Sequence, residues 1–140
     1  MHQRIEQFLD VSHVTYRVWH DKDMPFAIKA PADFANAVQY DYCRITKTLL
    51  LRANEQDSFC LVVAPFNRRV NFRMMSKALG VQRVQLATLE ELSRVLGYPP
   101  TAVSPLGAGP LPIFLDRDLL EYPTVLIGFR SNWCRNRDFA

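Results

Sequence analysis

The sequence predicts an α+β domain built around a mixed β-sheet, and three observations lead to this prediction. The chain has 140 residues, which is a usual length for one domain. Hydrophobic residues make up 49% of it, enough to fill a core. Its apolar runs of strand length come in short pairs between helical segments rather than in strict alternation with them, so a doubly wound sheet is not expected. We therefore expect residues 1–140 to form a single domain.

The first third of the chain predicts two helices and one strand. Residues 3–9 place apolar side chains at helical spacing. Residues 14–19 (VTYRVW) alternate in polarity and are rich in β-branched and aromatic side chains, which favours a strand. Residues 31–40 begin with a proline, which suits the first turn of a helix, and carry their apolar side chains on one face.

The centre of the sheet is predicted from two strongly apolar runs, residues 48–53 (TLLLRA) and 59–65 (FCLVVAP). The polar turn NEQD separates them, so we expect a hairpin with both strands substantially buried. Three further runs are expected to add strands: residues 81–87, 113–115 and 124–129.

Two more helices are predicted from their end signals. Asn71 can cap a helix that Gly80 ends. Thr88 with Glu91 three positions later is the pattern of a capping box. The buried stripe of this second helix is expected to consist of Leu89, Leu92, Val95 and Leu96.

Residues 97–112 (GYPPTAVSPLGAGPLP) hold three of the five glycines and five of the nine prolines of the chain. That density is incompatible with a helix interior or a central strand. Loops of this length are uncommon in compact domains and usually functional. We therefore expect a functional loop here.

The charge and cysteine content restrict the class of protein. The net charge is +3, and the chain has 13 arginines but only four lysines, which is compatible with nucleic-acid binding as well as with ordinary solvated charge. The N-terminus is too polar for a signal peptide and no apolar run reaches membrane-span length, so we expect a cytosolic protein. The cysteines show no CxxC spacing and are expected to be buried free thiols: Cys43, Cys60 and Cys134.

Several common chemistries find no support in the sequence. The histidines all lie near the N-terminus, and Ser104 has no G-x-S-x-G motif around it, so neither a catalytic triad nor a metal site is expected. No glycine-rich nucleotide-binding motif is present. The carboxylates of LDRDLLEY (115–122) are expected to cap and solvate a turn.

Lys47 is the residue whose position raises a functional question. It lies in RITKTLLLRA, where a polar turn enters a strongly apolar strand. A lysine at a strand end can extend its ammonium into solvent. Alternatively, it is a cation at the mouth of a cleft that faces a phosphate or a developing oxyanion. The sequence pattern leaves both readings open.

A set of short motifs in a fixed order resembles a known family. Lys47 entering KTLLL is followed by FCLVVAP, SKALG, EELSRVLGY, VSPLG and IFLD. Together they resemble the YbaK/ProX-type aminoacyl-tRNA deacylases, which are similar to the editing domain inserted in bacterial prolyl-tRNA synthetases. The resemblance extends over residues 14–130, and it implies a mixed, partly closed sheet flanked by helices.

The resemblance implies a trans-editing enzyme that hydrolyses the ester of a mischarged tRNA without metal or organic cofactor. The amino acid it removes is implied to be small, and a tRNA for proline is one candidate carrier. Lys47 matches the catalytic lysine of the family. His20 falls where many relatives have a histidine, which either makes a structural hydrogen bond or contacts substrate. The backbone of the proline-rich loop is implied to form the acyl pocket, with the candidate residues Thr101, Ala102, Val103, Ser104, Pro105 and Gly107.

The implied partner is the acceptor end of a mischarged tRNA, and an aminoacyl-tRNA synthetase is a second candidate partner. Positive residues on the turn and helix near the hairpin are the candidates for phosphate contacts: Arg44, Arg68, Arg69, Arg73 and Lys77. Two other functions stay open. Thr101 and Ala102 stand where the family usually has two glycines, which suits a non-catalytic module that binds aminoacyl-tRNA or a synthetase. An enzyme acting on another small ester or amide is the third reading.

Overall fold

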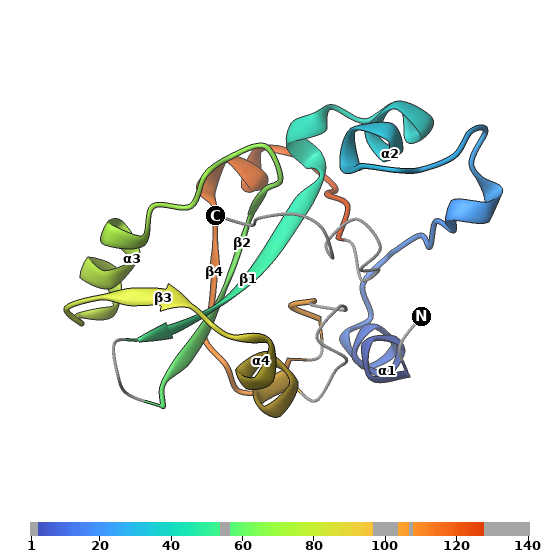
Figure 1. The fold of residues 1–140 in the computed structure, drawn as a ribbon. Helices are drawn as coiled ribbons and strands as arrows, with labels where there is room; N and C mark the ends of the chain where they lie inside the picture. Colours follow the sequence, from blue (N-terminus) through green and yellow to red (C-terminus); the bar gives the residue numbers. More distant parts are fainter. Residues whose placement is uncertain (1–2, 54–56, 97–103, 107, 128–140) are drawn as a thin grey trace.

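The computed structural model describes residues 3–53, 57–96, 104–106 and 108–127 (Figure 1). The strands in these ranges are β1 (Thr46–Ala53), β2 (Phe59–Pro65), β3 (Val84–Leu86) and β4 (Ile113–Leu115). The α-helices are α1 (Gln3–Ser12), α2 (Pro31–Val38), α3 (Phe72–Leu79) and α4 (Leu89–Leu96). Short 3-10 turns occupy Asp21–Asp23, Tyr42–Arg44 and Arg117–Glu121.

The strands form one sheet in the order β3-β1-β2-β4. β1 pairs antiparallel with both β2 and β3, whereas β4 runs parallel to β2. The predicted α+β class with a mixed sheet and flanking helices is therefore confirmed. The sheet is open, with β3 and β4 at its edges, so the partial closure that the resemblance implied is not seen among the described strands.

Two hydrophobic clusters cover the two faces of the sheet. On one face Leu49 and Leu51 pack with the apolar side chains of α3. On the other face Leu50 and Leu61 pack with α4 and with Ala108. Because side chains of a strand point alternately to opposite faces, each long strand contributes to both clusters, which explains why β1 and β2 are buried along almost their whole length.

Cap residues fix both central helices as the sequence predicted. The Asn71 side chain accepts a hydrogen bond from the Met74 amide at 3.0 Å, and Gly80 ends α3 in the left-handed conformation at φ 70°. At α4, Thr88 Oγ1 accepts from the Glu91 amide at 3.1 Å, while the Glu91 carboxylate accepts from the Thr88 amide at 3.0 Å. This reciprocal pair is a capping box.

Three of the sequence predictions of strands need correction. Residues 14–19 form no strand, because they pair with no other segment in the described residues and Val14 and Tyr16 are exposed. The strand expected at 81–87 is limited to β3. The strand expected at 124–129 is reduced, within its described part, to one bridge between Leu126 and Ile45. Alternating polarity predicts a strand only where a neighbouring strand is available to pair with it.

Two smaller expectations concern side chains. Leu89 was expected in the buried stripe of α4 but is 68% exposed, because it starts the helix on the side away from the sheet. Cys60 is buried and Cys43 half-buried, and both are free thiols, while Cys134 lies outside the described residues. Within the described ranges, none of the helices has the length and apolar character needed to cross a bilayer.

Candidate functional site

Lys47 is the second residue of β1 and pairs with Ala64 of β2. Its side chain is buried, with only 7% exposed. Strand alternation places it on the same face of the sheet as Leu49 and Leu51, the face covered by α3. The structure thus positions a cation within an apolar sheet rather than at a freely solvated strand end.

The Lys47 ammonium makes no hydrogen bond or ion pair within the described residues. Since no fully buried side-chain nitrogen or oxygen there lacks a partner, its tip must keep contact with solvent. Burial lowers the pKa of Lys47, and the nearby positive charge of Arg69 lowers it further. An anion that reached this ammonium would relieve both effects.

The start of β1 is held by a strand-like contact with a distant segment. The Thr46 amide donates to the Leu126 carbonyl at 3.0 Å, and Thr46 Oγ1 donates to the same oxygen at 2.9 Å. The Leu126 amide donates in turn to the Arg44 carbonyl at 2.9 Å. These bonds fix the backbone immediately before Lys47.

The Arg44 side chain strengthens this contact. Its Nε donates to the Thr124 carbonyl at 3.0 Å, and its guanidinium also hydrogen-bonds the Thr124 hydroxyl. The guanidinium carbon lies 3.7 Å from the ring centre of Tyr40 and 5.9 Å from that of Tyr122. We call Arg44 with Tyr40, Tyr122 and Thr124 the Arg44 clamp. The guanidinium donors of Arg44, which the sequence analysis assigned to phosphate contacts, are thus already occupied in part by protein groups.

Arg68 is also engaged with protein groups. Its guanidinium lies 3.3 Å from an Asp116 carboxylate oxygen and forms a second ion pair with Asp118. Asp116 in addition accepts a hydrogen bond from the Asp118 amide at 2.9 Å, which caps the following 3-10 turn as the sequence predicted. Arg68 therefore ties the turn after β2 to the segment after β4.

The remaining candidate cations have exposed side chains. Arg69 follows Arg68 on the same turn, and Arg73 and Lys77 lie one helical turn apart on α3. Their side chains form no hydrogen bond or ion pair within the described residues. Of these, Arg69 is the one whose charge is felt at Lys47.

The loop candidates are only partly within the described residues. Ser104 is fully buried and its Oγ accepts a hydrogen bond from the Leu106 amide at 3.2 Å, which closes a tight turn; Pro105 is buried beside it. The other loop candidates lie outside the described residues: Thr101, Ala102, Val103 and Gly107. No hydrogen bond joins Lys47 to the described part of the loop, so their common role in one pocket stays a prediction.

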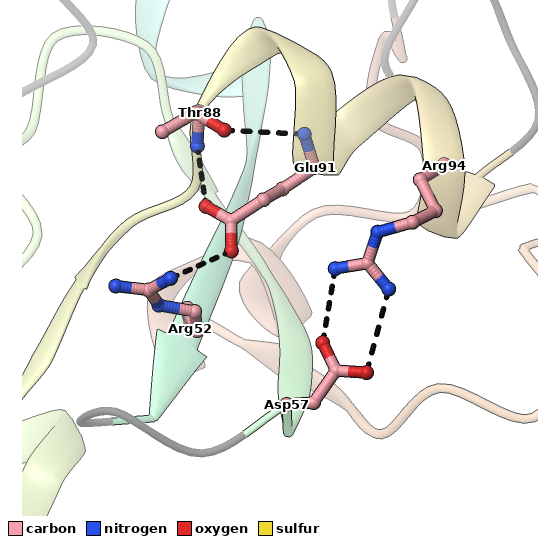
Figure 2. Close-up of polar contacts among 5 residues, drawn as sticks. All are labelled: Arg52, Asp57, Thr88, Glu91 and Arg94. Carbon is pink, nitrogen blue, oxygen red and sulfur yellow. Dashed lines mark hydrogen bonds and ion pairs between the residues drawn. The ribbon is translucent and has the colours of Figure 1, made fainter.

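The helix that leads into the loop is fastened to the hairpin by charges (Figure 2). Arg52 of β1 forms an ion pair with Glu91 at 2.9 Å, and Arg94 forms one with Asp57 at 2.9 Å. Hydrogen bonds from the Thr88 amide and from Arg52 lower the pKa of Glu91. At the other end of α4, Leu96 is fully buried. The starting point of the loop is therefore fixed.

His20 is exposed and lies in the N-terminal segment, where its carbonyl accepts a hydrogen bond from the Asp23 amide at 3.0 Å. Its side chain forms no hydrogen bond or ion pair with Lys47 or the loop among the described residues, so its role stays a prediction. Across all the residues that the structure describes, no three His, Cys, Asp or Glu side chains gather closely enough to hold a metal ion.

Sequence reasoning did not foresee the clamp or the ion pairs of Arg68. Thr124 is 80 positions from Arg44, and Asp116 is 48 positions from Arg68. No local pattern announces such contacts, since they depend on which segments the sheet brings together. The order of strands, β1-β2-β4, is the information that was missing.

A family model describing the aminoacyl-tRNA editing domain matches residues 27–132, which is most of the chain. This chain belongs to the aminoacyl-tRNA editing domain family. The match confirms the resemblance that Lys47 and the loop motifs suggested.

The relatives are much longer proteins. The editing domain is 32% identical over 101 residues to a proline–tRNA ligase of Sulfurihydrogenibium sp. (strain YO3AOP1) and 25% identical over 101 residues to one of Thermosipho melanesiensis. Each match covers 72% of this chain but only 17% and 18% of the two ligases. The chain thus spans less than a fifth of the length of these curated relatives.

Solved structures share the fold over nearly the whole chain. The crystal structure of hypothetical protein APE2540 has a TM-score of 0.76 at 27% identity, covering 93% of this chain and 85% of that one. A candidate trans-editing enzyme for prolyl-tRNA synthetase has a TM-score of 0.73 at 24% identity, covering 93% and 80%. At 24% identity, the match to this second structure shows only that the two chains share a fold.

Proposed function

We propose that this editing domain is a trans-editing aminoacyl-tRNA deacylase. The reaction is hydrolysis of the ester between the amino acid and the terminal ribose of a mischarged tRNA. Water adds to the ester carbonyl, the bond to the ribose oxygen breaks, and a free amino acid and an uncharged tRNA leave. The proposal depends most on one observation: Lys47 is largely buried in an editing-family fold, and its ammonium has no partner in the described residues.

The chemistry suits a site without a protein nucleophile. An aminoacyl ester is already activated, so positioning of substrate and stabilisation of developing negative charge supply most of the needed rate enhancement. A partly desolvated ammonium interacts more strongly with such charge than an exposed one would. In this proposal, Lys47 holds a substrate anion, either a phosphate of the acceptor end or the oxyanion that forms at the carbonyl.

The finer substrate assignment is a small amino acid carried by a tRNA for proline. Its support is that the curated relatives are proline–tRNA ligases. The side chains of Thr101 and Ala102, in place of the family's usual glycines, would narrow an acyl pocket and favour a small acyl group. The same two side chains also favour the second candidate function, a module that binds aminoacyl-tRNA or a synthetase without hydrolysis.

A panel of mischarged tRNAs tests the proposal. The wild-type chain is incubated with tRNA for proline carrying alanine, cysteine or proline, and with a non-cognate tRNA carrying alanine, and the remaining ester is measured over time. We expect faster loss of one small mischarged amino acid than of proline, at rates above spontaneous hydrolysis.

Two other outcomes separate the alternatives. Tight, salt-dependent tRNA binding without hydrolysis of any panel member would contradict the deacylase and support the binding module. Hydrolysis of a free aminoacyl ester at the same rate as of the tRNA-linked one would indicate an esterase that does not recognise tRNA. Each result rejects the leading proposal by a different route.

A further inference from the structure

We propose that Lys47 and Arg69 bind one phosphate group of the tRNA acceptor end together, and that the adjacent Arg68 takes no part. The choice of RNA as ligand rests on the proposed function. The pairing of these two cations rests on the structure of the turn that follows β2. The inference therefore assigns a second residue to the anion site and separates it from a neighbour of identical chemistry.

The first step concerns Lys47. Its side chain is 7% exposed, yet no carboxylate among the described residues forms an ion pair with it. A charged group in such surroundings is unfavourable unless a counter-charge reaches it. Because the tip of the side chain keeps contact with solvent, a ligand anion can approach it. The site thus suits an anion that the described residues do not provide.

The second step places Arg69 next to this ammonium. Thr46, which precedes Lys47, pairs with Pro65, and the Phe66 amide donates to the Ile45 carbonyl at 2.7 Å. The Arg68 amide then donates to the Pro65 carbonyl at 3.0 Å, which closes a turn after β2. This turn lies next to the beginning of β1, because Pro65 pairs with Thr46. Arg69 follows directly on this turn. Consistent with that position, its charge contributes to lowering the pKa of Lys47.

The third step separates the two adjacent arginines. Arg68 is neutralised by Asp116 and Asp118, which hold it toward the segment after β4. Arg69 is exposed and forms no ion pair within the described residues. Two cations near each other with no carboxylate between them repel, and a bound phosphate would turn this repulsion into two attractions. Arginine suits that role because its planar donors match phosphate oxygens.

Two sources of phosphate exist at the acceptor end of a tRNA: the phosphodiesters of the single-stranded 3′ end and the phosphate at the 5′ terminus. Their shared chemistry is a phosphate with free non-bridging oxygens. We therefore use an uncharged RNA minihelix of the acceptor stem in three forms, complete, without the 5′ phosphate, and without the single-stranded 3′ nucleotides. If Arg69→Gln no longer weakens binding to one of the two truncated forms, the phosphate that this form lacks is the one that Arg69 binds.

The experiment measures the affinity for the minihelix by fluorescence anisotropy over a range of salt. Arg69→Gln is expected to weaken binding on the order of tenfold and to reduce the salt slope by about one. Arg69→Lys should recover part of the affinity, because it restores the charge without the planar fork. Arg117→Gln removes one exposed charge that has no partner in the described residues and serves as the matched control, with affinity unchanged.

A double-mutant cycle tests whether the two cations share one phosphate. If they do, Lys47→Met combined with Arg69→Gln should weaken binding by less than the product of the two single effects. Full multiplicativity would overturn the shared site. So would an effect of Arg68→Gln as large as that of Arg69→Gln, or an unchanged salt slope in Arg69→Gln.

Failure of the inference differs from failure of the proposed function. A wild-type chain that hydrolyses mischarged tRNA, with an Arg69→Gln variant that binds RNA as tightly as wild type, contradicts only the assignment of Arg69. A wild-type chain that neither binds the minihelix nor hydrolyses the panel contradicts both. Thermal unfolding of each variant confirms that an effect on binding is not a loss of fold.

Discussion

At the scale of single residues, Lys47 carries a cost that the fold tolerates. Most buried positions of β1 are apolar, and a lysine among them loses hydration of its ammonium without gaining an ion pair in the described residues. A local loss of stability of this kind is common where activity needs a destabilising residue. The energetic penalty and the proposed anion site are therefore two aspects of the same arrangement.

This penalty predicts a pH dependence of stability. The pKa of Lys47 is lowered below its ordinary value of 10.5 in the folded state, so the folded state releases the proton first as pH rises. Below the folded pKa both states are protonated and the full cost of burying charge is present. Between the folded pKa and 10.5 the unfolded state binds more protons, so the free energy of unfolding rises with pH relative to a chain without this group.

We therefore expect Lys47→Met to be more stable than wild type near neutral pH, by on the order of 1 kcal/mol. The difference should shrink as the pH rises from 7 toward 10.5, because the folded state releases the lysine proton before the unfolded state does. Urea unfolding at both pH values measures it. Lys77→Met, at an exposed position on α3, is the control and should show no such trend. A constant difference at both pH values would contradict the lowered pKa.

Sequence reasoning at this scale identified Lys47 but could not separate the arginines around it. A cation entering an apolar strand is visible in the letters, because the change from polar to apolar occurs within a few residues. Whether Arg44, Arg68 or Arg69 is available for a ligand depends on partners far along the chain. The structure supplies those partners for Arg44 and Arg68.

At the scale of elements, short-range signals predicted helices well and isolated strands poorly. The Asn71 cap and the Thr88–Glu91 capping box act within one turn, so both could be read directly from the sequence. Residues 14–19 have the composition of a strand but pair with nothing in the described residues. The short lengths of β3 and β4 likewise depend on where the sheet ends.

The Arg44 clamp is the element-scale feature with a testable consequence. It joins the start of β1 to the segment around Leu126 and so fixes the backbone that carries Lys47. Arg44→Gln should lower the free energy of unfolding by about 1–2 kcal/mol, through loss of the bonds to Thr124 and the stacking on Tyr40. Urea unfolding measures this, and Arg117→Gln, which removes the same charge elsewhere, should change stability by less than about 0.5 kcal/mol.

The same variant distinguishes positioning from phosphate binding. If Arg44 acts through the clamp, Arg44→Gln should reduce the deacylation rate at saturating tRNA while the salt slope of RNA binding stays as in wild type. A variant of unchanged stability whose salt slope falls by about one would instead make Arg44 a phosphate contact, and the clamp would not be its main role.

At the scale of the whole molecule, the apolar hairpin explains why the fold was predictable. Two long buried strands pair in one register, and each face of the sheet then needs one amphipathic helix, which α3 and α4 provide (Figure 1). The parallel addition of β4 was not predictable in the same way. It follows a long loop whose path no local pattern determines, and it is this addition that brings Asp116 to Arg68.

The measurement that tests the central claim most directly is single-turnover deacylation by wild type and Lys47→Met on the mischarged tRNA that the wild type hydrolyses fastest. Loss of the charge that holds the substrate anion in place should slow the reaction by on the order of 100-fold or more. Lys47→Arg keeps the charge in another shape and should retain part of the activity. A Lys47→Met variant that is folded and deacylates at the wild-type rate would contradict the account.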